Sequence, residues 1–171
     1  MEALHKELEL IQAIIGRMAQ NSFQVKAWLI GVLGAMLAFT RDELFATGGP
    51  LGQALMMNAF LLLPILCFWY LDAFFLSTER LYRELYKWVV QHRPSGNTDY
   101  LYDLNTFTRT ANGSTVNLLK PQNSWQKVAI SKTLWPFYGM PLLFVIGLMA
   151  FNVWSHCNLP TKTCAPTHCM H

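Results

Sequence analysis

Apolar residues along this chain are gathered into three long runs, not spread at the spacing of a soluble helix or strand. The runs cover residues 27–40, 54–76 and 134–154. The third contains no charged residue, and at about 1.5 Å per residue it forms roughly 31 Å of helix, which matches a hydrocarbon core of about 30 Å. Trp135 and Tyr138 near its start and Trp154 at its end are typical of interfacial aromatic belts. The pattern predicts three transmembrane helices.

The first two runs are less regular than the third. The second is broken by Asn58, Pro64 and Asp72, and a proline in a transmembrane helix is tolerated where neighbouring helices satisfy the freed backbone groups. The first run is short, so it crosses only if Lys26 and Arg41 reach outward to the headgroups. A run of that length is also compatible with an interfacial or re-entrant segment.

Composition supports a membrane protein, because 53% of the residues are hydrophobic and only 13% are charged, against roughly 25% charged in an average soluble domain. The first twenty-six residues carry several charges and no cleavable apolar region, so we expect the first span to be retained. The net charge of +3 is modest, and the basic residues lie mainly beside the spans. We therefore expect no nucleic-acid binding.

The distribution of Lys and Arg predicts the orientation in the membrane. Three precede the first span, one lies between the first and second, eight lie between the second and third, and one follows the third. Basic residues mark the cytoplasmic side. We expect a multi-pass protein of a bacterial inner membrane with its N-terminus and central region in the cytoplasm and its C-terminus periplasmic or external.

Residues 1–26 predict an amphipathic cytoplasmic helix. An apolar stripe with alternating spacings of four and three runs along it, with Glu7 among the polar residues off the stripe. Its members are Leu4, Leu8, Ile11, Ile15 and Met18. The stripe fits a helix lying on the membrane or against its own protein, and equally a self-associating bundle. Gly31, Ala35 and Ala38 form a small-residue face directly downstream, and the two features together favour a homo-oligomer.

Residues 77–132 predict a cytoplasmic region. The second helix should continue beyond its span and stop before Pro94. Residues 94–124 are polar, and Asn112-Gly113 between alternating patches indicates a hairpin. The predicted fold is thus an all-α membrane protein of three transmembrane helices, with an amphipathic N-terminal helix and a small α/β or irregular cytoplasmic element between the second and third spans. We expect residues 155–171 to form an external tail.

Asp72 is the first residue that could carry function, because an ionisable side chain inside an apolar run is costly unless it faces protein or water. Glu79 and Arg83 follow it on the same helix face. One interpretation is a charged pore vestibule or gate. The alternatives are structural: an interfacial helix end with ordinary ion pairs, or an Asp72 carboxylate buried against Arg80 or Arg83. The pore or gate candidates are Asp72, Glu79, Arg80, Arg83 and Glu84.

The tail is rich in cysteine and histidine, and its cysteines are Cys157, Cys164 and Cys169. An external tail favours disulfides, with one cysteine of three left over. The ligand types also fit zinc, although the spacing matches no zinc module, and the cysteines could equally form no defined bond. We expect no metal site, and we interpret Cys67, within the second span, as a packed core thiol.

No sequence motif indicates catalysis. A phosphate-binding loop, a Gly-x-Ser-x-Gly elbow and a His-Glu-x-x-His helix are all missing from the chain. We therefore expect neither an enzyme nor a bound cofactor.

The layout resembles the small membrane effectors of bacterial anti-phage defence, in particular the SLATT class. The shared features are the leading helix of residues 3–26, two spans joined by residues 41–53, and a charged helix continuing from Trp69-Tyr70-Leu71-Asp72 into Glu79-Arg80-Leu81-Tyr82-Arg83. They cover a little over half of the chain, and the third span with its Cys-rich tail departs from the two-span layout. The resemblance implies an oligomer that perturbs the membrane when a cytosolic sensor or defence protein detects infection, and it implies no catalytic residue.

These observations predict an oligomeric inner-membrane effector or channel-like protein that contacts lipid, with residues 94–132 receiving a signal. The first alternative is a non-conducting membrane-anchored adaptor that recruits or regulates a cytosolic partner. A proton-coupled transporter using Asp72 is a second alternative, for which three spans and one acidic residue are a poor basis.

Overall fold

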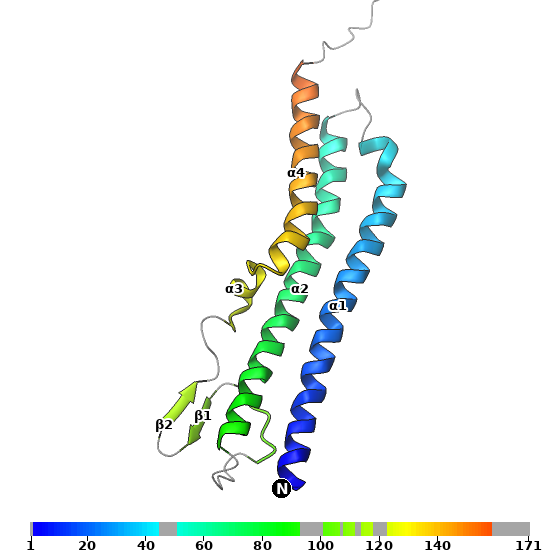
Figure 1. Cartoon of the computed structure of the whole chain (residues 1–171). Coiled ribbons are helices and arrows are strands. Elements are labelled where there is room, and N and C mark those ends of the chain that lie inside the picture. The colour runs from blue at the N-terminus through cyan, green and yellow to red at the C-terminus, as the bar shows by residue number, and fades with distance from the viewer. Residues whose placement is uncertain are drawn as a thin grey trace, which may run out of the picture.

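The computed structural model of the chain describes residues 2–44, 51–92, 101–106, 108–111, 114–117 and 123–158. Within these residues the protein consists of three long helices, one short helix and a two-stranded hairpin (Figure 1). The elements are α1 (Glu2–Leu44), α2 (Leu51–His92), β1 (Thr108–Ala111), β2 (Ser114–Asn117), α3 (Trp125–Ala129) and α4 (Leu134–Asn158).

Three helices, α1, α2 and α4, are long and apolar enough to cross a membrane, which supports a multi-pass membrane protein. α1 has 43 residues and α2 has 42, so each is roughly 63–65 Å long, about twice the thickness of a hydrocarbon core. Each therefore combines a membrane-spanning segment with a long extension outside it. The amphipathic helix of residues 2–26 and the first span are one continuous helix, and α2 ends at His92, before Pro94.

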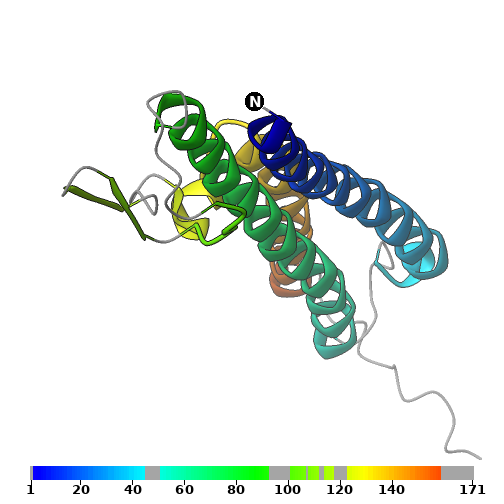
Figure 2. The same cartoon turned by 90° about the horizontal axis from the view of Figure 1, so that it is seen from below.

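α2 is the central element, and it packs against α1, α3 and α4. α1 and α2 run antiparallel along their whole length, while α4 runs antiparallel to the first half of α2 (Figure 1). Seen along the bundle, the hairpin and α3 lie on the side of α2 away from α1 (Figure 2). We call residues 2–21 of α1 and 77–92 of α2 the stalk. The remaining residues of α1 and α2, together with α4, are the membrane-spanning half.

Two separate apolar cores hold the long helices together. The core in the membrane-spanning half joins all three helices through Leu29, Leu61, Ile65, Ala73, Leu134, Tyr138 and Val145. The stalk core joins α1 to α2 through Ile11, Leu85, Trp88 and Val89. Buried polar side chains, including Ser22, Asp72, Ser77 and Glu79, occupy the helices between the two cores. A layer with these polar side chains therefore separates the two apolar cores, and Glu7, Asn58 and Asn152 are further buried polar residues outside this layer.

The apolar stripe of the first helix packs inside a single chain. Ile11 is 1% exposed, and Leu4, Leu8 and Ile15 pack around the stalk core, with Met18 partly buried further along. This is the alternative in which the helix lies against its own protein, and it removes the stripe as an argument for self-association. Glu7, which the sequence pattern placed off the stripe, is also buried at 1% exposure.

The two strands pair antiparallel, with Thr108 opposite Asn117 and Ala111 opposite Ser114. Asn112 and Gly113, the predicted turn, lie between the paired strands but outside the described residues. Within the predicted signal-receiving region, residues 94–100, 107 and 118–122 also lie outside the described residues, as does the tail from residue 159 onward.

Candidate functional site

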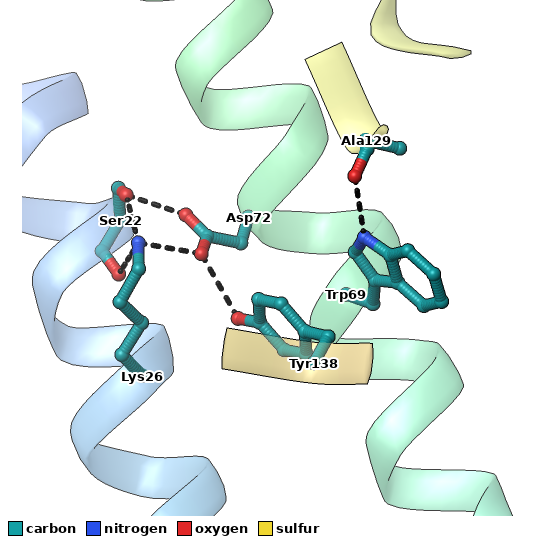
Figure 3. A network of polar contacts seen from close by, with 6 residues as sticks. All are labelled: Ser22, Lys26, Trp69, Asp72, Ala129 and Tyr138. Atoms are coloured by element: carbon teal, nitrogen blue, oxygen red, sulfur yellow. Dashed lines mark hydrogen bonds and ion pairs between the residues drawn. The ribbon is translucent and has the colours of Figure 1, made fainter. Parts of the chain in front are cut away.

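Asp72 lies at the point where α1, α2 and α4 meet, and its side chain is completely buried. Figure 3 shows a donor group on each of three residues pointing at its carboxylate. The Lys26 ammonium lies 2.5 Å from Oδ2, the Tyr138 hydroxyl donates to the same oxygen at 2.9 Å, and the Ser22 hydroxyl donates to Oδ1. We call Ser22, Lys26, Asp72 and Tyr138 the Asp72 cluster.

The two ends of the ion pair differ in exposure. The Lys26 side chain is 23% exposed, whereas the Asp72 side chain is 0% exposed. Lys26 also donates to the Ser22 hydroxyl oxygen at 2.8 Å, so this hydroxyl accepts from the cation and donates to the anion. The cluster is neutral in sum, and the carboxylate is hydrogen-bonded on both oxygens, which is the condition under which a buried charge is tolerated.

The inward-facing residues of α1 and α2 explain why the side chains of the Asp72 cluster meet. Ser22 lies four residues beyond Met18 on the same inward-facing stripe that begins at Leu4, and Lys26 follows one helical turn later. Asp72 precedes Glu79 by two turns on the inward face of α2, and both are buried. The polar residues thus occupy core positions of an otherwise apolar helical interface.

Trp69 connects the cluster to the segment before α4. Its indole N–H donates to the Ala129 carbonyl of α3 at 3.0 Å (Figure 3), and its ring stacks parallel to that of Tyr138 with centroids 6.0 Å apart. Tyr138 is 0% exposed. Its position is therefore fixed both by Asp72 and by Trp69, and the cluster ties α1, α2 and α4 together at one level.

The other predicted gate residues follow Asp72 along α2. Glu79 is buried and its carboxylate accepts from Arg83 Nε at 2.8 Å, while the Arg83 side chain remains 60% exposed. Glu84 pairs with Lys87 at 3.0 Å, and Arg80 is partly buried. The suggestion that Asp72 is buried against Arg80 or Arg83 is wrong, because its cation is Lys26 on the neighbouring helix.

Sequence reasoning missed Lys26, Ser22 and Tyr138 as members of the site. Lys26 was expected to reach towards the headgroups and Tyr138 to belong to an interfacial belt, yet both face the buried carboxylate. A signal was present in the chain. Lys26 and Asp72 lie at similar distances from the loop that joins the first two helices, and residues so placed in a helical hairpin face each other.

The small-residue face of α1 is exposed in the described part of the chain. This holds for Gly31, Ala35 and Ala38, and a Cβ atom added to Gly31 would meet no atom of the described residues within 4 Å. Leu29, by contrast, is 1% exposed and belongs to the core of the membrane-spanning half. The small residues therefore lie on the face of α1 that is turned away from the described parts of α2 and α4.

The cysteines add no bonded site within the described part of the chain. Cys157, near the end of α4, is an exposed free thiol, while Cys164 and Cys169 lie outside the described residues. Cys67 is exposed on α2, so the expectation of a packed core thiol is wrong, because this face of α2 turns outward. Among the described residues no cluster of three or more His, Cys, Asp or Glu side chains could hold a metal ion.

The Asp72 cluster can hold three helices in fixed positions relative to one another, through an ion pair that is stable only while its partners stay in place.

Comparison with protein-family models, with curated proteins and with solved structures finds no match to this chain.

Proposed function

We propose that the chain is a subunit of an oligomeric inner-membrane effector, or channel-like protein, that perturbs the bilayer when its cytoplasmic stalk receives a signal. The observation that carries the proposal is the Asp72 cluster, a buried ion pair at the level where two unbroken helices pass from the stalk into the membrane-spanning half. A signal that moves α1 against α2 at this level would have to separate Lys26 from Asp72. Because separating a buried charge from its partner is costly, the pair would resist such a movement until the signal supplies that free energy.

The exposed face of α1 supports assembly. Small residues let two transmembrane helices approach closely, and Gly31, Ala35 and Ala38 are exposed in the described part of the chain. With the stalk stripe used inside the chain, this face is the candidate contact between subunits. Anti-phage defence is the setting suggested by the resemblance in layout, with a cytosolic sensor or defence protein as the source of the signal.

Burial of the acidic side chains changes how the gate candidates fit this proposal. Asp72 and Glu79 are 0% and 6% exposed, so within one chain they form the joint between the helices. Arg80, Arg83 and Glu84 are more accessible and are the residues that we place near a cytoplasmic mouth.

The same burial favours one second candidate, a non-conducting membrane-anchored adaptor. If Asp72 and Glu79 serve only to fix the helices, the stalk becomes a rigid platform for a cytosolic partner and no passage opens. Leakage across a membrane separates this candidate from the effector.

The test uses the full chain reconstituted in vesicles loaded with a self-quenching dye. We expect Asp72→Asn to leak faster than the wild type, because the isosteric amide keeps its size but no longer holds Lys26. Adding Gly31→Leu and Ala35→Leu should return leakage to background and lower the oligomeric state, because the bulkier side chains block close approach of α1 helices.

Gly147→Leu is the matched control, because Gly147 lies in α4 with nothing within 4 Å of an added Cβ. It should leave both leakage and assembly unchanged. Vesicles that stay sealed with both the wild type and Asp72→Asn, although the protein is inserted, would contradict the effector and support the adaptor.

A further inference from the structure

An open groove of about 350 Å³ lies between α2 and α3. The wall from α2 consists of Leu66, Trp69 and Tyr70, and the opposite wall includes Trp125 and Ile130. Gln126 is the polar side chain among the lining residues. A concave, largely apolar and aromatic surface of this size is typical of a site for a small apolar ligand.

Two contacts fix the walls of the groove. The Trp69 indole N–H donates to the Ala129 carbonyl at 3.0 Å, which holds α3 against α2. The rings of Tyr70 and Trp125 meet edge to face with centroids 5.4 Å apart. The groove is therefore formed by the fold itself, before any ligand binds.

The groove lies at the level where the apolar part of the bundle ends. Trp69 precedes Asp72 by three residues on α2, and α3 directly precedes α4, whose Tyr138 binds Asp72. Ile130 is 72% exposed and Trp125 is 44% exposed, so apolar side chains line an open surface at this level. Where the three long helices cross a membrane, a surface at this level lies beside the lipid headgroups.

The segment that forms one wall of the groove carries two basic residues and no acidic one. Lys127 lies in α3, three residues before the lining residue Ile130. Lys132 follows in the turn before α4, both lysines are exposed, and residues 123–158 contain no Asp or Glu. The segment that forms this wall is thus positively charged, which is complementary to an anionic headgroup.

We infer that this groove binds an anionic phospholipid, with an acyl chain between α2 and α3 and the headgroup phosphate against Lys127 and Lys132. The site requires only that the three helices cross a membrane, and it is independent of the effector proposal. A lipid held there contacts both α2 and the segment that leads into α4, so it would support the packing of α3 on α2.

The test measures retained lipid on the purified full chain by native mass spectrometry, with phosphatidylglycerol and phosphatidylcholine of identical acyl chains. We expect the wild type to retain phosphatidylglycerol preferentially. Lys127→Gln with Lys132→Gln should weaken phosphatidylglycerol binding roughly tenfold or more, to the level of phosphatidylcholine. Lys6→Gln with Lys87→Gln removes the same charge from the exposed stalk surface and should leave the preference intact.

A second variant tests the acyl-chain part of the groove. Ile130→Gln changes an exposed lining residue, so the fold should be kept while retention of both lipids falls and their ratio stays unchanged. Equal retention of the two lipids by the wild type would overturn the inference. So would a preference that survives loss of both groove lysines, or one that is lost to the same extent in the stalk control.

Discussion

Lys26→Met should destabilise the protein more than Asp72→Asn, although the two changes break the same ion pair. Removing Lys26 leaves the Asp72 carboxylate, which is 0% exposed, without its cation, and breaking a buried pair in this way costs about 3–5 kcal/mol. In Asp72→Asn the remaining charge is on Lys26, whose 23% exposed side chain can reach outward along its apolar stem. Asparagine also keeps an oxygen that accepts from Tyr138 or Ser22, so we expect a smaller loss of about 1–3 kcal/mol.

The measurement is the free energy of unfolding of the full chain in mixed micelles titrated with SDS. The double variant Lys26→Met with Asp72→Asn should be more stable than Lys26→Met alone, because no buried charge remains unpaired, with a coupling energy of about 0.5–3 kcal/mol. A strictly additive double variant would show that the pair does not hold the helices together, and equal losses in the two single variants would contradict the argument from the different exposure of the two side chains.

Ile11→Ala should lower the free energy of unfolding by about 2–5 kcal/mol, the range for truncating a buried isoleucine. Ile11 is 1% exposed and packs with Leu85, Trp88 and Val89 in the stalk core. Since these contacts lie within one chain, the oligomeric state of the protein that remains folded should not change. Unfolding in mixed micelles and the mass of the native assembly are the two readouts.

Leu10→Ala provides the matched control, because Leu10 is the preceding residue of α1 and is 44% exposed. Its effect on unfolding should stay within roughly 0.5 kcal/mol, as for most surface substitutions. A lower oligomeric state in folded Ile11→Ala would contradict the intramolecular role of the stripe and restore self-association through it.

The membrane-spanning helices could be predicted because lipid imposes a constraint that acts along the chain itself. A span must be apolar over about twenty residues, and residues 134–154 satisfy this without reference to any other part of the protein. The same holds for the end of α2 at His92, where Pro94 stops a helix for a local steric reason.

The members of the Asp72 cluster could not be assigned by the same reasoning, because they are neighbours only after the hairpin closes. When only the residues of α2 are considered, Arg80 and Arg83 are the expected ion-pair partners of Asp72. The structure instead places Lys26 of α1 at the carboxylate. The cost of burying Asp72 correctly demanded a partner, but the identity of that partner depends on how α1 packs against α2. The packing partner of the apolar stripe on α1 could not be assigned from the sequence either, because its spacing fits a contact within the chain and a contact between subunits equally well.

Cys67 and Glu7 show that the polarity of neighbouring residues in the sequence does not predict whether a side chain is buried. Cys67 is surrounded by apolar residues yet is exposed on α2, because in a membrane protein the outward face is as apolar as the core. Glu7 lies among charged residues yet is buried. In both cases the direction of the side chain is set by the packing of α1 against α2.

The central claim, three spans with the stalk on the cytoplasmic side, is tested most directly by thiol accessibility in spheroplasts. The test uses single-cysteine variants in which all other native cysteines are replaced by serine. Cys157, exposed at the end of α4, should react with a membrane-impermeant maleimide in intact spheroplasts, whereas a cysteine introduced by Gln91→Cys at the end of the stalk should react only after lysis. Labelling of Gln91→Cys in intact spheroplasts, with Cys157 protected until lysis, would contradict this orientation, and labelling of both positions before lysis would contradict three spans.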